Sequence, residues 1–367
     1  MRVLITTDTV GGVWEYTTTL ATALEAYGHA VMVAVIGKLS DGRAAALPAA
    51  AEVRVRPFRL EWMADAESDV EAAGEWLREL ALEWRPDLVH LNQFGYAPAG
   101  FGAPTIVVAH SDVYSWFSEV QHREAPVEWA PYRQWVRDGL AAADFVVAPS
   151  GYQSDLLQRH YGRAADRIIW NGASVPPSGE VPKERLAVSA GRAWDEAKGM
   201  SVLDAALAGR TDPPVYVLGD TTAPEGSSFN PRNVLARGRM ERVEMGSWLD
   251  LASVYVSPSL YEPFGLAPLE AAFHGCALLL SDIGSFRELW DGCADFFEPG
   301  DPVSLGAGLT RLFADSDHCA RRADQARRRA NERYTADRMV DGYLKLYHDL
   351  QLTGAGMPGS SDSGVFE

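Results

Sequence analysis

The sequence predicts an α/β protein with two consecutive open parallel sheets and a cleft between them. Its 367 residues are enough for two domains that each bury a core. Short β-branched runs alternate with helical stretches in both halves of the chain. Between the halves, residues 175–184 (VPPSGEVPKE) are rich in proline and glycine and show no periodicity, which indicates a linker.

The first half contains a series of strands whose hydrophobicity is continuous rather than alternating. We expect these strands at residues 2–6, 30–36, 52–58, 87–92, 104–110 and 144–150. Such runs are typical of a parallel sheet that helices cover on both faces. The clearest helices are expected at residues 12–27, 66–84 and 127–143. Residues 111–140 match no general pattern.

The same alternation starts again after the linker. The expected strands are residues 186–192, 214–220, 233–239, 253–259 and 277–282. The expected helices are residues 198–208, 241–251, 267–274, 302–314 and 318–350. From residue 353 onward the low complexity of the chain predicts a disordered tail.

The composition argues against nucleic acid and anionic membranes as partners. There are 50 acidic and 33 basic side chains, giving a formal net charge of −17, which phosphate-rich surfaces repel. The basic run at 321–329 lies among acidic residues and is interpreted as a solvated helix face. A soluble partner that is uncharged or locally neutralised is expected.

Cysteine content and hydropathy indicate a cytoplasmic protein. Cys276, Cys293 and Cys319 are few and lack metal-ligand spacing, as expected of reduced thiols. No segment approaches the roughly 18 apolar residues of a membrane span. The apolar run at the start is too short for a signal peptide and fits a first buried strand. We therefore expect no integral membrane association.

Two glutamates stand eight positions apart in SPSLYEPFGLAPLEAAFHGC, residues 257–276. Pro263 places Glu262 on a loop after a strand, and Pro268 suits the first turn of a helix that carries Glu270. The backbone N–H groups between them form an anion site at a sheet edge that binds ligands. Carboxylates would repel the anion itself, so they are better used to accept hydrogen bonds from neutral hydroxyls beside it. An anion with hydroxyl-bearing groups on either side describes a nucleotide sugar. Taken alone, the eight-residue spacing is explained more simply by two unrelated glutamates on the protein surface.

This stretch resembles the paired-glutamate motif of the retaining glycosyltransferase family 4, which has the GT-B fold of two Rossmann-like domains. The resemblance is strongest over residues 186–300. It implies that Glu262 contacts hydroxyls of the donor sugar and Glu270 the ribose, and that the amides of Phe264, Gly265 and Leu266 bind phosphate. It also implies an acceptor domain at 1–175, a donor domain at 176–334, and a helix at 335–352 that packs back on the first domain before the tail, 353–367.

A second motif supports a diphosphate site. In GRAWDEAKGM, residues 191–200, Arg192 and Lys198 follow a buried strand six positions apart. Two fixed cations offset the charge that develops on a departing diphosphate. Family members carry an arginine and a lysine in this loop for that role. The alternative is a pair of solvated bases on a loop.

Two glycine-containing turns complete the expected donor site. Gly11 and Gly12 follow the first strand, and a diglycine lets the backbone approach a ligand closely. The motif lacks the later glycine of G-x-G-x-x-G, which weakens a hydride-transfer hypothesis. By resemblance, this loop approaches the donor phosphate or the acceptor. The same resemblance implies that the turn Gly238-Arg239-Met240 lies near the nucleotide base and contacts it through its backbone.

Several first-half residues are candidates for the sugar and the acceptor. In related enzymes a histidine at the end of a strand, here His110, lies near the donor sugar. A capped structural role is the alternative, and His90 is interpreted as structural. Trp14 and Trp116 follow candidate loops and are expected to stack on acceptor sugar rings, although a core position is equally compatible with the sequence. Asn92 is expected to face the acceptor.

The resemblance implies a retaining transfer from a nucleotide-diphosphate sugar to a hydroxyl of a soluble metabolite or of an oligosaccharide or polysaccharide precursor. The catalytic candidates are His110, Arg192, Lys198 and Glu262. No metal or other cofactor is expected, because the sequence has no Asp-x-Asp pair and no His/Cys cluster. The alternatives are a nucleotide-sugar epimerase or a phosphorylase on the same scaffold, or a non-catalytic nucleotide-sugar-binding protein.

Overall fold

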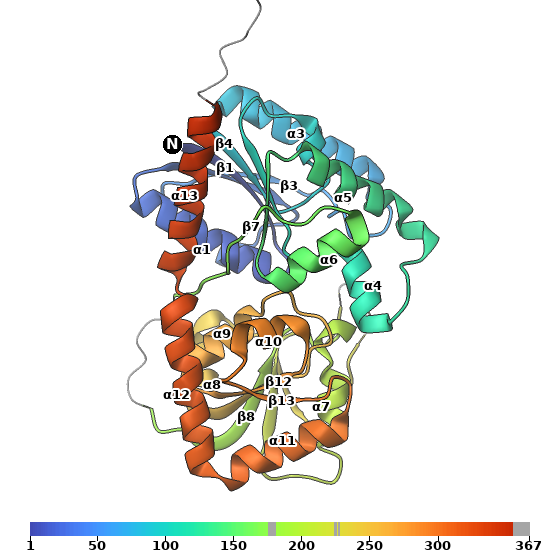
Figure 1. Cartoon of the computed structure of the whole chain (residues 1–367), viewed down its shortest axis with the longest axis vertical. Helices are drawn as coiled ribbons and strands as arrows, with labels where there is room; N and C mark the ends of the chain where they lie inside the picture. Colours follow the sequence, from blue (N-terminus) through green and yellow to red (C-terminus); the bar gives the residue numbers. More distant parts are fainter. Residues whose placement is uncertain (175–180, 224–225, 227, 355–367) are drawn as a thin grey trace, which may run out of the picture.

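The computed structural model describes residues 1–174, 181–223, 226 and 228–354, and it contains two α/β lobes (Figure 1). Residues 175–180 of the expected linker and 355–367 of the expected tail lie outside the described residues. Each lobe is built on one parallel sheet, so the predicted α/β architecture with two Rossmann-like sheets is confirmed.

The first sheet has seven strands in the order β3-β2-β1-β4-β5-β6-β7, and all neighbours are parallel. Its strands are β1 (Arg2–Asp8), β2 (Ala30–Ile36), β3 (Glu52–Arg56), β4 (Leu88–Leu91), β5 (Thr105–Val108), β6 (Phe145–Ala148) and β7 (Arg167–Ile168). Its helices are α1 (Gly12–Ala26), α2 (Asp41–Ala44), α3 (Glu67–Trp84), η1 (Ala97–Ala99), α4 (Val113–Gln121), η2 (Val127–Trp129), α5 (Ala130–Ala142) and α6 (Gly151–Tyr161). The strand order reverses between β1 and β4, where open α/β sheets bind ligands.

The second sheet has six parallel strands in the order β10-β9-β8-β11-β12-β13. Its strands are β8 (Glu184–Ala190), β9 (Val215–Leu218), β10 (Leu235–Gly238), β11 (Ala252–Ser257), β12 (Ala277–Ser281) and β13 (Asp295–Phe297). The helices here are η3 (Glu196–Lys198), α7 (Met200–Ala206), α8 (Arg242–Leu251), α9 (Leu266–Phe273), α10 (Gly284–Trp290), α11 (Pro302–Ala314) and α12 (Ser316–Arg333). Its strand order reverses between β8 and β11.

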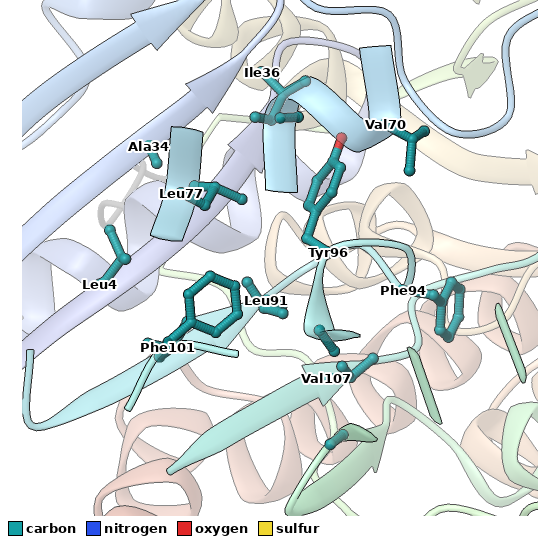
Figure 2. Packing of buried hydrophobic residues seen from close by; sticks show 14 of the residues in the cluster. Leu4, Ala34, Ile36, Val70, Leu77, Leu91, Phe94, Tyr96, Phe101 and Val107 are labelled. Atoms are coloured by element: carbon teal, nitrogen blue, oxygen red, sulfur yellow. The ribbon is translucent and has the colours of Figure 1, made fainter. Parts of the chain in front are cut away.

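Apolar side chains cover both faces of each sheet, which explains the continuous hydrophobicity of the strands. In β1, Leu4 belongs to the core on one face, whereas Val3 and Ile5 belong to the core on the other. Figure 2 shows the first of these cores, to which α3 contributes Val70 and Leu77. Helices α1 and α13 (Ala336–Gly354) pack on the opposite face.

The C-terminal helical segment is two helices, so the single helix expected over 318–350 is wrong, whereas the separate helix expected over 335–352 agrees with α13. Helix α12 packs on α9 and β12 of the second lobe, and α13 packs on α1 of the first (Figure 1). Thr335 interrupts the helix: its Oγ1 accepts from Arg338 N at 3.3 Å, and its backbone forms a parallel bridge with Ala173. Threonine is a favoured N-cap residue, and this signal was overlooked.

Helix α13 is fixed to the first lobe by a buried histidine. His90 of β4 is fully buried, and its Nδ1 lies 2.6 Å from Tyr347 Oη of α13. Its Nε2 lies 3.1 Å from Tyr16 Oη of α1. The structural role expected for His90 agrees with these contacts.

The two lobes contact each other through polar groups at the N-terminus of α6. Glu288 of the second lobe accepts hydrogen bonds from Gly151 N at 2.9 Å and Tyr152 N at 2.8 Å, so it caps α6 from across the interface. Ser150 Oγ donates to Pro263 O at 2.6 Å. These bonds position the loop that contains Glu262 against the first lobe.

Candidate active site

The predicted site residues meet where the loops after the central strands of both sheets come together. Gly11 and Gly12 follow β1, Arg192 follows β8, and Leu266 lies after β11. A Cβ built on Gly11 would lie 3.8 Å from Arg192 Nη1, and one built on Gly12 would lie 3.3 Å from Leu266 Cδ1. The glycine loop of the first lobe therefore reaches the donor side of the second lobe.

Gly11 adopts a conformation that side chains rarely allow, because its φ is +80° where it precedes α1. A Cβ on Gly12 would press tightly against the end of the Leu266 side chain, which would have to shift slightly. The diglycine thus permits the close backbone approach that the sequence indicated.

Arg192 and Lys198 lie on one loop after β8, as predicted. Arg192 Nη2 donates to Asp195 Oδ2 at 2.7 Å, and its guanidinium carbon lies 5.3 Å from the centroid of the Trp194 ring. Asp195 also accepts from Ala197 N at 3.0 Å. The Arg192 side chain is oriented by these contacts and remains 37% exposed, so it keeps donors for a ligand.

Lys198 and Glu262 form an ion pair, which the sequence did not predict. Lys198 Nζ contacts Glu262 Oε2, and the two side chains are only 20% and 18% exposed. Ser285 Oγ donates to the backbone carbonyl of Glu262. A cation suited to phosphate and a carboxylate suited to hydroxyls therefore lie side by side, one on the loop after β8 and the other on the loop after β11.

The N-terminus of α9 supplies backbone donors at the same place. Gly265 precedes the helix with φ +91° and receives no side-chain cap, while the N–H groups of Leu266 and Ala267 have no acceptor within the helix. The Phe264 ring is buried and packs edge-on against Tyr334 with centroids 5.6 Å apart. Phe264 can therefore offer a ligand only its backbone.

Glu270 lies one turn into α9 and contacts an arginine that sequence reasoning missed. Its Oε1 lies 3.6 Å from Arg242 Nη2, and its side chain is 18% exposed. Burial raises the pKa of Glu270 to about 6, although Arg242 acts in the opposite direction. Arg242 Nη1 also lies 3.3 Å from Glu15 Oε2 of α1. Arg242 begins α8 directly after the 238–240 turn, and this position was the available signal.

The turn at residues 238–240 ends β10. Gly238 O accepts from Gly219 N at 2.8 Å, Arg239 is exposed, and Met240 packs partly on the core of the second lobe. Arg43 of the first lobe is close enough to this turn to feel the charge of Arg239 electrostatically. Burial and that charge lower the pKa of Arg43. Arg43 is a second cation that the sequence analysis did not identify.

Asn92 orients the imidazole of His110, and burial keeps that ring neutral. The Asn92 amide donates to Thr6 O at 2.6 Å and Thr17 Oγ1 at 3.1 Å, so its Oδ1 must be the acceptor that lies 2.8 Å from His110 Nε2. His110 thus carries its proton on Nε2 and presents Nδ1 as an acceptor. Burial lowers the pKa of His110 to about 3.

This network corrects the role expected for Asn92. Its side chain is only 7% exposed, and both amide atoms are engaged by the protein. Asn92 therefore positions His110 and does not face an acceptor.

The two tryptophans expected to stack on an acceptor are placed differently. Trp14 is only 2% exposed and belongs to the core beneath α1, with the Arg43 guanidinium 5.4 Å from its ring centroid. That expectation is wrong for Trp14, because its ring has no free face. Trp116 is half-buried and packs in an apolar cluster with Tyr261 of the second lobe, so it contributes to the interface between the lobes.

Two buried carboxyl groups in the first lobe were also missed. Burial raises the pKa of Asp8, at the end of β1, to about 6, against a hydrogen bond from Val10 N at 2.7 Å and the charge of Arg192. Burial raises the pKa of Glu61 to about 7, against a hydrogen bond from Gly95 N at 2.7 Å. The position of Asp8 just before the glycine loop was a signal for it.

Within the described residues, no group of three or more His, Cys, Asp or Glu side chains is arranged to hold a metal ion. In the same part of the chain, every helix is too short or too polar to cross a bilayer.

Both halves of the chain match known protein families. Residues 10–174 match Glycosyltransferase Family 4, and residues 184–315 match Glycosyl transferases group 1. A glycogen synthase of Mycobacterium tuberculosis is 27% identical over 399 residues, which cover 92% of this chain and 91% of that protein. An α-maltose-1-phosphate synthase of Mycolicibacterium smegmatis is 25% identical and covers 68% of this chain and 74% of its own.

Solved structures show the same two-lobed arrangement. Sucrose-phosphate synthase from Thermosynechococcus elongatus has a TM-score of 0.79 at 18% identity and covers 97% of this chain and 100% of its own. Anabaena Alr3699/HepE in complex with UDP and glucose has a TM-score of 0.71 at 15% identity, covering 95% and 99%. The likeness establishes that the fold is GT-B.

Proposed function

Because this chain belongs to glycosyltransferase family 4, the group 1 glycosyltransferases, we propose that it transfers a sugar from a nucleotide-diphosphate sugar to an acceptor hydroxyl with retention of anomeric configuration. The observation that carries this proposal is the ion pair between Lys198, on the loop after β8, and Glu262, on the loop before the uncapped N-terminus of α9. It combines a cation, a hydroxyl acceptor and backbone donors, which are the groups that a nucleotide-diphosphate sugar requires.

In the proposed complex, Arg192 and Lys198 bind the diphosphate together with the amides at the start of α9. Glu262 accepts hydrogen bonds from hydroxyls of the donor sugar, and Glu270 accepts from the ribose. The 238–240 turn lies beside the base. The second lobe, residues 176–334, therefore holds the donor, and the first lobe, residues 1–175, holds the acceptor, with the 335–352 helix joining them.

The proposed reaction exchanges one bond for another on the same face of the sugar. The bond from the anomeric carbon to the diphosphate oxygen breaks, and a bond from that carbon to the acceptor oxygen forms. The acceptor proton passes to an oxygen of the leaving diphosphate. Arg192, Lys198 and the α9 amides offset the charge on the leaving group, so we propose that no metal ion is required. His110 Nδ1 is available to accept from a sugar hydroxyl.

We propose a soluble acceptor, namely a carbohydrate metabolite or a growing oligosaccharide or polysaccharide. The net charge of −17 disfavours an anionic membrane surface. Relatives named as a glycogen synthase and an α-maltose-1-phosphate synthase support the same class. A cytoplasmic location is part of the proposal, supported by three cysteines that are free and buried.

The product of the reaction tests the proposal. The protein is incubated with α-linked UDP-, GDP-, ADP- and TDP-sugars and glucose or maltooligosaccharides in excess EDTA, and the product is followed by proton NMR. We expect an α-linked product, lost in Glu262→Gln but not in the exposed control Glu71→Gln. A β-linked product would contradict retention, and loss of activity in EDTA would contradict metal independence. An isomerised sugar without transfer would favour an epimerase.

A further inference from the structure

A hollow of about 300 Å³ lies away from the proposed donor site, where the chain crosses between the lobes. Its walls are formed by β7 and the segment after it, by the end of α12 and by one face of α13. None of the residues proposed for the reaction lines it. A volume of this size is at the lower end of the range for small-molecule sites.

The hollow concentrates positive charge in an acidic protein. Four cations line it, Arg167, Arg333, Arg338 and Lys345, with a single acid, Glu332. Arg167 is paired with Asp349 at 3.3 Å. In the part of the chain that the structure describes, the other three cations have no acidic partner within ion-pair distance. Several cations around one hollow, three of them without an acidic partner among the described residues, favour an anionic ligand, and a phosphate group most of all.

An aromatic ring adds a second kind of contact. Trp170 lines the hollow and is 37% exposed. Its position is fixed by edge-on packing against the buried Tyr334, with ring centroids 5.5 Å apart. An exposed indole beside cations suits a sugar ring, whose C–H face is apolar and whose phosphate is charged. The chemistry therefore points to a phosphorylated monosaccharide.

The cations belong to segments that pack on different lobes. Arg333 ends α12, which packs on the second sheet, whereas Arg338 and Lys345 lie on α13, which packs on the first lobe. Between the helices the chain pairs with the other crossing segment, because Ala173 N donates to Tyr334 O at 3.1 Å. A ligand held by both helices would favour one angle between the lobes.

We propose that this hollow is an effector site for a phosphorylated monosaccharide and that its occupancy shifts the closure of the two lobes. The phosphate is bound by Arg333, Arg338 and Lys345, and the sugar ring packs on Trp170. The site goes beyond the proposed transferase function and is testable without a nucleotide sugar.

Isothermal titration of the full chain with glucose 1-phosphate, glucose 6-phosphate, fructose 6-phosphate and mannose 6-phosphate at constant ionic strength tests binding. We expect at least one of these compounds to bind. Its affinity should fall about tenfold in Arg338→Ala, because that variant loses one charge-assisted hydrogen bond to the phosphate. Binding should be retained in Arg321→Ala, which removes an exposed cation elsewhere on α12, and in Arg192→Ala. Binding should also exceed that of glucose or inorganic phosphate alone.

Three outcomes would overturn the site: no binding of any of the four compounds, equal affinity in Arg338→Ala and the wild type, or loss of binding in Arg192→Ala. The last outcome would place the sugar phosphate in the donor site. The coupling is tested by small-angle scattering, where the bound ligand should change the radius of gyration of the wild type but not of Arg338→Ala. An unchanged radius in the wild type would refute the effect on closure.

Discussion

Replacing Lys198 with methionine removes one charge and little volume from the proposed diphosphate site. If Lys198 offsets charge on the leaving group, its loss should lower kcat by about 10²–10³-fold, as for other preorganised donors at a developing charge. The change also leaves Glu262 without its ion-pair partner, and the Glu262 side chain is only 18% exposed. Because the unpaired carboxylate is mostly buried, the stability cost is on the order of 3 kcal/mol. A two-lobed chain with extensive cores should tolerate this loss and fold, so the variant should be folded and still nearly inactive.

The two effects are separated by a second substitution. Initial rates of nucleotide diphosphate release are measured alongside thermal denaturation for Lys198→Met, for Lys198→Met with Glu262→Gln, and for the exposed control Arg321→Met. The double variant should regain the lost stability without regaining the rate. A fall in kcat of less than about tenfold would refute the role of Lys198 in departure. Recovery of the rate in the double variant would show that Lys198 serves only to neutralise Glu262.

Other expected outcomes concern buried groups and the interface between the lobes. Burial raises the pKa of Glu61 from 4.5 to about 7. Between pH 4.5 and pH 7 the folded state therefore binds a proton at Glu61 that the unfolded state has lost. As pH rises through this range, the unfolding free energy should fall by on the order of 3 kcal/mol. Glu61→Gln should flatten this dependence in urea unfolding at pH 5 and pH 8, and an unchanged dependence would be evidence against a buried carboxylate. Asn92→Ala should lower kcat about tenfold, because it removes the hydrogen bond from His110 Nε2 to Asn92 Oδ1 and releases the ring. In the wild type, NMR should find that imidazole neutral above about pH 4, and titration near pH 6.5 would contradict its burial. In Gly284→Ala, the new Cβ would lie 2.7 Å from Tyr152 Cε2 and should cost about 1–3 kcal/mol in urea unfolding. In a Tyr152→Ala background, Gly284→Ala should cost much less, and additive losses would show that the two residues do not touch.

The strands and the main site loops were predictable because their signals are local. Continuous apolar runs marked most of the strands, and Gly11, Arg192 and Glu262 each followed such a run. In a parallel sheet, position after a strand determines the edge at which a residue lies. The sequence thus identified which loops carry the site before their relative positions were known.

Contacts between distant segments were not predictable in this way. The Lys198–Glu262 ion pair joins loops 64 residues apart, and Arg242 reaches Glu270 only because α8 begins beside α9. Tyr16 of α1 is buried against Tyr343, with ring centroids 6.0 Å apart, because α13 returns from the end of the chain to cover α1. Such features arise from tertiary packing, about which a single residue's neighbours in sequence carry little information.

The most direct measurement is the thermal stability of the full chain with UDP-, GDP-, ADP- and TDP-sugars, compared with Arg192→Ala. A ligand that binds only the folded state raises the unfolding temperature with its occupancy. Donor binding at Arg192 predicts that sugars of one nucleotide raise the midpoint of the wild type and have little effect on the variant. No shift with any of them, or an equal shift in Arg192→Ala, would contradict a nucleotide-sugar site at the loop after β8.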